Sequence, residues 1–221
     1  MFKYLERIEL DSDLGGLDVV TFESIMAIDN DLLPEAAKKL GGNDVAHLVE
    51  WLSLKDDDIR YRAFQLLQHR SALCDDVYPY WDTLRDKLKS DNSYQRSIGV
   101  MLIAENVRWD AGDRIEGVLN DLLELLNDEK PITIRQCIQS LGKIASAKPT
   151  LLGAKIAGKL VSFNIMAVKE TMRKFILLDI LNVLLLIRKT LQTDEIEGFV
   201  MDALSGGILD PKSKKQIAAL L

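Results

Sequence analysis

The stretch Asp56–Leu67 (DDDIRYRAFQLL) constrains the fold of this chain more than any other segment. Its residues Ile59, Ala63 and Leu67 recur at i, i+4 and i+8, so they share one face of a helix that can be buried. The acidic residues before Ile59 suit the first turn of that helix. The small Ala63 side chain would let a neighbouring helix approach closely. The stretch therefore predicts a packed helix.

Related stretches follow at intervals of a few tens of residues. The residues that align with Arg60 are Arg96, Arg135 and Lys169, at separations of 36, 39 and 34 residues. A drifting period of this size is typical of stacked helix pairs, none of which can bury its apolar face alone. The chain also holds 36 Leu against 12 Val, which favours helices over strands. The sequence therefore predicts an all-α repeat array.

Glycine, proline and aspartate mark the boundaries of the expected helix pairs. We expect an N-terminal capping pair at residues 18–42, repeats at 44–71, 77–106, 112–146 and 149–189, and a C-terminal capping pair at 194–221. The second helix of the last repeat is expected to run from about Ala167 to Lys189. No flexible linker divides the chain, so its 221 residues are predicted to form a single domain.

The segment Asp56–Leu67 fits the pattern D-x-x-[I/V]-R-x-x-A-x-x-x-L, and Asn92–Ile103 fits it loosely. This pattern resembles the second-helix signature of HEAT and HEAT-like repeats, and the resemblance covers roughly residues 44–190. It implies a right-handed α-α solenoid, or superhelix, whose second helices line a concave groove. The family serves many partners, so the resemblance implies no particular ligand.

The net charge of −6 conceals a regional asymmetry. Residues 1–58 carry 5 basic and 14 acidic side chains, whereas residues 131–189 carry 10 basic and 2 acidic side chains, a net charge of +8. A local potential of this kind steers charged partners. The basic block favours a partner that presents an acidic segment.

A polar stripe beside the apolar stripe of the second helices supplies the candidate partner-binding residues. The candidates are Arg62, Gln65, His69, Arg96, Arg135, Gln139, Lys143, Lys169 and Arg173. The last five are spaced four apart within two successive helices, so we expect them to form a positive wall in the groove. A structural alternative is favoured for Arg60 and Arg96, in which an arginine pairs with a turn aspartate of a neighbouring repeat and sets the stacking.

No catalytic or metal-binding pattern stands out in the sequence. His47 and His69 are the only histidines, and zinc-ligand spacing, a Gly-rich phosphate loop and a G-x-S-x-G motif are all missing. We therefore expect no catalytic residue, no metal and no cofactor. The expected function is that of a non-enzymatic scaffold that binds a protein through the concave groove.

One enzyme class and nucleic-acid binding remain as alternatives. The stretch Trp109–Asp113 (WDAGD) resembles the W-D-x-x-D stretch of DNA alkylation-repair glycosylases, which are HEAT-like solenoids. The resemblance implies that Asp113 would stabilise an oxocarbenium-like sugar while Trp109 packs the damaged base. An acidic chain is a poor DNA binder, however, because affinity for DNA comes mainly from phosphate contacts. The three tryptophans are more simply interpreted as core anchors than as base-stacking platforms.

Other features bear on the compartment. The first thirteen residues carry six charges, which does not suit a signal peptide, and Cys74 and Cys137 form no C-x-x-C pair. The longest apolar run, Phe175–Ile187, contains Asp179 and Asn182 and is too short to span a bilayer. We expect a soluble, cytoplasmic protein without membrane contact, in which a neighbouring Arg or Lys satisfies Asp179.

Overall fold

The computed structural model describes residues 20–221, and no strand occurs among them. Residues 18 and 19 of the expected N-terminal pair lie outside this range. The α-helices are α1 (Phe22–Met26), α2 (Leu33–Lys39), α3 (Gly42–Trp51), α4 (Asp57–Ser71), α5 (Trp81–Lys87), α6 (Ser93–Asn106), α7 (Arg114–Glu124), α8 (Pro131–Ala147), α9 (Pro149–Val161), α10 (Glu170–Arg188), α11 (Asp194–Ser205) and α12 (Pro211–Ala218). The short 3-10 helices are η1 (Asn30–Leu32), η2 (Tyr78–Tyr80), η3 (Val107–Trp109), η4 (Leu125–Asn127) and η5 (Ile165–Ala167). The chain is therefore all-α in the part described.

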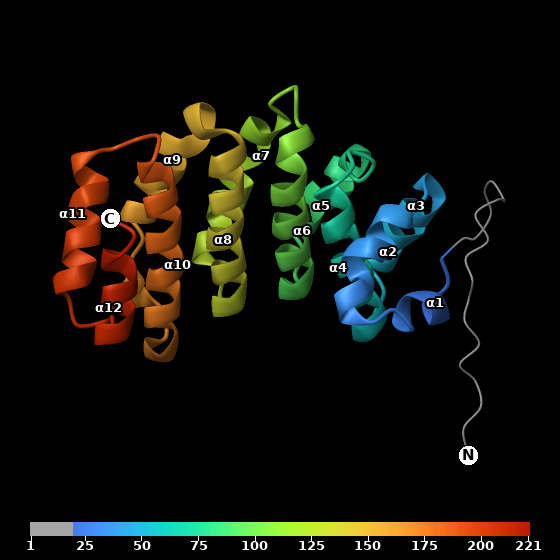
Figure 1. Cartoon of the computed structure of the whole chain (residues 1–221), viewed down its shortest axis with the longest axis horizontal. Helices are drawn as coiled ribbons and strands as arrows, with labels where there is room; N and C mark the ends of the chain where they lie inside the picture. The colour runs from blue at the N-terminus through green and yellow to red at the C-terminus, as the bar shows by residue number, and fades with distance from the viewer. Residues whose placement is uncertain (1–19) are drawn as a thin grey trace, which may run out of the picture.

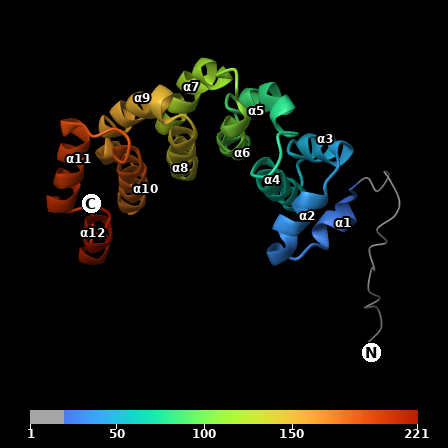
Figure 2. The same ribbon diagram turned by 45° about the horizontal axis from the view of Figure 1, so that its top comes forward.

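The helices follow one another along a curved row (Figure 1). Figure 2 shows α3, α5, α7 and α9 on the outer side of the curve and α4, α6, α8 and α10 on its inner side. We call the latter four the second helices, because each is the second member of its pair. The pair α1 and α2 packs on α4 at one end, and α11 and α12 pack on α10 at the other.

Small residues set the closest approaches between helices. A Cβ atom built on Gly99 of α6 would lie 2.8 Å from the backbone oxygen of Leu84 in α5. A Cβ on Gly142 of α8 would lie 3.0 Å from Cγ2 of Val183 in α10. Ala63, at the matching repeat position in α4, is fully buried. Ala63 and Gly99 occupy the small-residue position of the repeat pattern, whereas Gly142 lies five residues after Cys137, the residue at that position in α8.

Side-chain caps define where several helices begin. Oδ1 of Asp56 accepts hydrogen bonds from the backbone N–H groups of Asp58 and Ile59, at 3.1 and 3.0 Å, at the start of α4. The side chain of Asn92 accepts one from the N–H of Tyr94 at the start of α6. Oδ1 and Oδ2 of Asp110 accept from the first two N–H groups of α7, at 3.0 and 2.9 Å. Each cap satisfies N–H groups that have no partner within the helix.

The last long helix starts later than its sequence suggests. A helix was expected from about Ala167, but α10 begins at Glu170 and Lys169 has an extended backbone (φ −50°, ψ 132°). The side chain of Asn164 accepts a hydrogen bond from the N–H of Met166 and caps the separate turn η5. This local capping competes with helix formation, which is why the prediction for this boundary was wrong.

Helix α10 is the most apolar second helix, and its residues Ile176, Ile180 and Leu184 are fully buried. It also carries the buried carboxylate of Asp179. Among residues 20–221 there is no helix with the length and apolar character that a membrane crossing requires.

Candidate partner-binding surface

The side chains exposed along the second helices face the inner side of the curve, which we call the inner face. Their other side is covered, because α3 packs on α4, α5 packs on α6, and α9 packs on both α8 and α10. The second helices also contact one another in sequence, from α4 through α6 and α8 to α10. The inner face is therefore a continuous surface built from four helices.

A buried glutamate links three of these helices. Oε1 of Glu105 in α6 accepts a hydrogen bond from Nε2 of Gln68 in α4 at 3.1 Å. The same oxygen pairs with Nζ of Lys143 in α8. The Glu105 side chain is only 8% exposed, whereas that of Lys143 is 49% exposed. The carboxylate is thus inside and the ammonium group faces solvent.

A second buried carboxylate links α8 to α10. Asp179 accepts from Nε of Arg135 at 2.6 Å and from Nη2 of Arg135 at 3.3 Å. Its Oδ1 also accepts from Nε2 of Gln139 at 3.0 Å. The Arg135 side chain is 29% exposed against 10% for Asp179, and its guanidinium lies 5.4 Å from the ring centroid of Phe175. Asp179 is therefore satisfied by a neighbouring arginine, as its position in an apolar run predicted.

The structure places Arg135, Gln139 and Lys143 together on the inner side of α8, on one helical stripe. All three hold buried carboxylates, so the cations Arg135 and Lys143 are not free on a solvated face. Arg135 uses two of its five N–H donors on Asp179, and Lys143 uses one of three on Glu105. The remaining donors belong to side chains that reach solvent.

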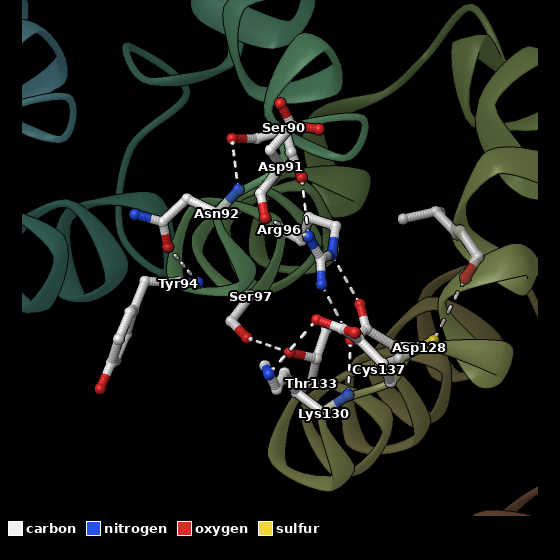
Figure 3. Close-up of polar contacts among 12 residues, drawn as sticks. Ser90, Asp91, Asn92, Tyr94, Arg96, Ser97, Asp128, Lys130, Thr133 and Cys137 are labelled. Carbon is white, nitrogen blue, oxygen red and sulfur yellow. Dashed lines mark hydrogen bonds and ion pairs between the residues drawn. The ribbon is translucent and has the colours of Figure 1, made fainter.

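Arg96 has a different role (Figure 3). Its Nε and Nη2 donate to Asp128 at 2.6 and 2.9 Å, and its Nη1 donates to the carbonyls of Ser90 and Asp91 at 2.8 and 3.0 Å. These contacts join the turn before α6 to the turn before α8. Arg96 therefore pairs with a turn aspartate of the neighbouring repeat, as the structural alternative expected, and its side chain is only 13% exposed. Arg60 instead pairs with Asp57 of its own repeat.

Lys169 and Arg173 do not form the helical stripe that was expected. Lys169 precedes α10 and is exposed, whereas the Arg173 side chain turns back toward the start of the helix. Nε of Arg173 donates to the carbonyl of Val168 and Nη2 donates to that of Met166, both at 3.0 Å. The positive wall is thus shorter than predicted, because Arg173 binds backbone oxygens.

The remaining candidates lie on α4. Nη1 of Arg62 donates to Oδ1 of Asn30 at 2.9 Å, which ties α4 to η1 of the N-terminal pair. Gln65 and His69 are half-buried on the same helix. Arg62 therefore contributes to the docking of the N-terminal pair.

Four large apolar side chains on the second helices are exposed but were not among the predicted partner-binding residues. They are 45–65% exposed, and we call them the apolar row: Tyr61, Tyr94, Ile132 and Phe175. In Figure 3, Tyr94 points away from the Arg96–Asp128 contact. The guanidinium of Arg60 lies 5.5 Å from the ring centroid of Tyr94. Tyr61 and Ile132 each stand two residues before a buried residue, Ala63 and Ile134, so helical periodicity already points them away from the buried side.

Helical phase places the apolar row on the inner face. We call the hydrogen-bonded contacts of Glu105 and Asp179 the carboxylate bridges. Each member of the apolar row shares a helical stripe with a residue of one of these bridges, at a spacing of four, seven or eleven residues. The pairs are Tyr61 with Gln68, Tyr94 with Glu105, Ile132 with Gln139, and Phe175 with Asp179. Since these bridges join adjacent second helices, the apolar row runs along the same surface, closer to the helix starts.

A groove of about 410 Å³ lies between α8 and α10 on this surface. Its lining includes Gln139, Lys143, Ser146, Asn182 and Leu186. Gly142 and Val183 also line it, and a Cβ atom built on Gly142 would lie 3.0 Å from Cγ2 of Val183. The groove therefore combines hydrogen-bonding groups with an apolar wall.

The residues of the W-D-x-x-D stretch make contacts within the protein. Nε1 of Trp109 donates to the carbonyl of Ser71 at 2.8 Å. Asp113, which has a positive φ of 52°, forms an ion pair with Lys148 at 2.7 Å. The intervening Asp110 is buried and accepts from the Tyr78 hydroxyl at 2.8 Å, in addition to capping α7. Burial and this hydrogen bond raise the pKa of Tyr78.

Within residues 20–221, no three His, Cys, Asp or Glu side chains gather closely enough to hold a metal ion. Burial raises the pKa of the Cys137 thiol, whose Sγ lies 3.2 Å from the carbonyl of Leu122. Comparisons with protein-family models and with curated proteins found no match.

Proposed function

We propose that this protein is a non-enzymatic scaffold of the HEAT-like class, a right-handed α-α solenoid that binds a protein partner along its inner face. One observation carries the proposal: exposed apolar side chains and outward-facing cations occur together on consecutive second helices. Large apolar groups beside basic groups on one surface are typical of interaction sites.

The chemistry of the surface indicates an acidic partner segment that also carries apolar side chains. Glu105 and Asp179 are buried behind Lys143 and Arg135, so an approaching chain meets the cations first. Unused N–H donors of both cations can bind carboxylates of the partner. The apolar row supplies contacts that depend little on salt, whereas the charged contacts weaken as salt rises.

Selection of peptides from a random display library on the purified protein tests this proposal. We expect enriched peptides to combine Asp or Glu with large apolar residues. Ile132→Asp and Tyr61→Asp should weaken their binding about tenfold or more, because each removes an exposed apolar contact and adds a repelling charge. Both side chains are exposed, so the fold should persist. The matched control is Lys155→Glu, at an exposed position of the outer helix α9.

Three results would contradict the proposal. Enriched peptides without acidic residues would exclude the charge argument, and equal binding by Ile132→Asp and Lys155→Glu would exclude the inner face. Release of alkylated bases from methylated duplex DNA, lost in a folded Asp113→Asn variant, would favour the glycosylase alternative. We expect no such release, because Trp109 and Asp113 are held by Ser71 and Lys148.

A further inference from the structure

Lys87, at the end of α5, is a buried cation without a carboxylate partner. The residue is buried, with only 8% of its surface exposed. Its Nζ donates to Oγ of Ser53 at 2.9 Å and to Oε1 of Gln95 at 2.6 Å, and both acceptors are neutral. None of the ion pairs found among residues 20–221 includes Lys87. A buried charge without a counter-charge is costly, so the arrangement calls for an anion.

The next junction along the row contains a paired cation. There the turn before α8 supplies Asp128, which binds Arg96 from the preceding second helix (Figure 3). Lys87 also lies between two successive turns, since it bonds Ser53 of one and Gln95 just after the other. At the junction that holds Lys87, the groups bound to its ammonium are instead a hydroxyl and an amide.

An open cleft of about 670 Å³ lies at this junction, beside the turns that precede α4 and α6. Its lining includes Lys87, Arg60, Ser53, Ser90 and Asn92. The hydroxyls of Ser53 and Ser90 each accept one hydrogen bond, from Lys87 and from the N–H of Asn92, and each keeps its own O–H to donate. The cleft thus offers several donors to one ligand.

The two carboxylates that line the cleft are already held by arginines. Asp57 pairs with Arg60, and Asp86 accepts from Arg85 at 3.2 Å. Neither contacts Lys87, and both are exposed. They leave the ammonium of Lys87 without a counter-charge.

Burial and the positive charge of Arg60 both lower the pKa of Lys87. An anion in the cleft would offset both effects, because it would supply the counter-charge that the protein withholds. A tetrahedral oxyanion suits a site with an ammonium and more than one hydroxyl, since its oxygens can accept from different directions.

We propose that this cleft binds a small oxyanion of the phosphate class, held by the ammonium of Lys87 and the hydroxyls of Ser53 and Ser90. The site lies at the turns of the helix pairs, where Tyr94 of the apolar row also lines the cleft, and it does not depend on the partner-binding function. Inorganic phosphate is the probe for the free ligand, and acetate is the probe for a carboxylate.

Titration calorimetry and thermal unfolding at constant ionic strength test the site. Phosphate should bind the wild type and raise its Tm, and acetate should bind more weakly. Lys87→Met keeps the aliphatic stem and should weaken phosphate binding about tenfold or more, because it removes a charged hydrogen-bond donor. The control Lys155→Met should bind phosphate like the wild type. Absence of phosphate binding in the wild type, or equal binding in Lys87→Met, would overturn the proposal.

A second variant covers the case in which Lys87→Met does not fold. Ser90→Asp places a carboxylate in the cleft, so it should raise Tm and abolish the response to phosphate. Continued phosphate binding by folded Ser90→Asp would contradict the site. Tighter binding of acetate than of phosphate would reject the phosphate class.

Discussion

The inner face is organised at the residue scale by two buried carboxylates, Glu105 and Asp179. The sequence indicated Asp179, because it is an isolated acidic residue within an apolar run, but Glu105 was not predicted. Asp179 was expected to find an arginine or lysine, and it binds Arg135. The identity of that partner could not be predicted, since it depends on how α8 and α10 pack. Arg135, Gln139 and Lys143, which were assigned to partner binding, therefore also hold the second helices together.

We expect Asp179→Ala to lower the free energy of unfolding by about 1–3 kcal/mol, the usual range for hydrogen bonds to charged groups. The loss should stay below that of a fully buried pair, because Arg135 is 29% exposed and can turn toward water. Asp179→Asn, which keeps an acceptor, should cost less than Asp179→Ala. Urea denaturation measures both changes. Equal stability of wild type and Asp179→Ala would show that the bridge contributes nothing.

Asp210 provides a pH-dependent contact at the start of α12. The hydrogen bond from Lys174, followed by one from the N–H of Ser213, lowers the pKa of Asp210 to about 2. The folded-state pKa lies below the ordinary value of about 4, so its contribution is present above pH ~4 and is lost as pH falls through about 2. Lys174→Met should move the Asp210 midpoint upward in a carboxyl NMR titration. An unchanged midpoint would assign the shift to Ser213 alone.

At the scale of elements, repeat spacing and cap residues predicted most helices within a few residues. Asp56 and Asn92, the first residues of the repeat pattern, are the N-caps of α4 and α6. The prediction was wrong at Lys169, where Asn164 caps a separate short turn. The exposure of Tyr94 could not be anticipated either, because burial depends on what a neighbouring helix covers. Local signals thus define where elements begin, and packing defines which faces remain open.

Two glycine substitutions should have opposite effects on stability. Gly158→Ala in α9 meets no atom within 4 Å, so the gain in helix propensity should stabilise the protein by about 0.5–1 kcal/mol. Gly99→Ala would place its Cβ 2.8 Å from the Leu84 backbone oxygen, which cannot move without shifting α5. We expect this variant to be destabilised despite the same gain in propensity. Thermal unfolding of the two variants measures the difference, and stabilisation of both would contradict the close helix contact.

At the scale of the whole molecule, the helices form a curved row, and pairs far apart along it do not pack together (Figure 2). A compact domain of this length would have a radius of gyration of about 17 Å. We expect small-angle scattering to give a larger value, because a row of stacked pairs is elongated. A value at or below that of a compact domain would contradict the solenoid arrangement.

The carboxylate bridges on the inner face also have a mechanical consequence. They join neighbouring second helices on the concave side, so straightening the array would stretch them. The bridges therefore contribute to bending stiffness and to the resting curvature. A bound acidic segment that draws Arg135 and Lys143 toward itself would soften this side, so that the array opens around its ligand.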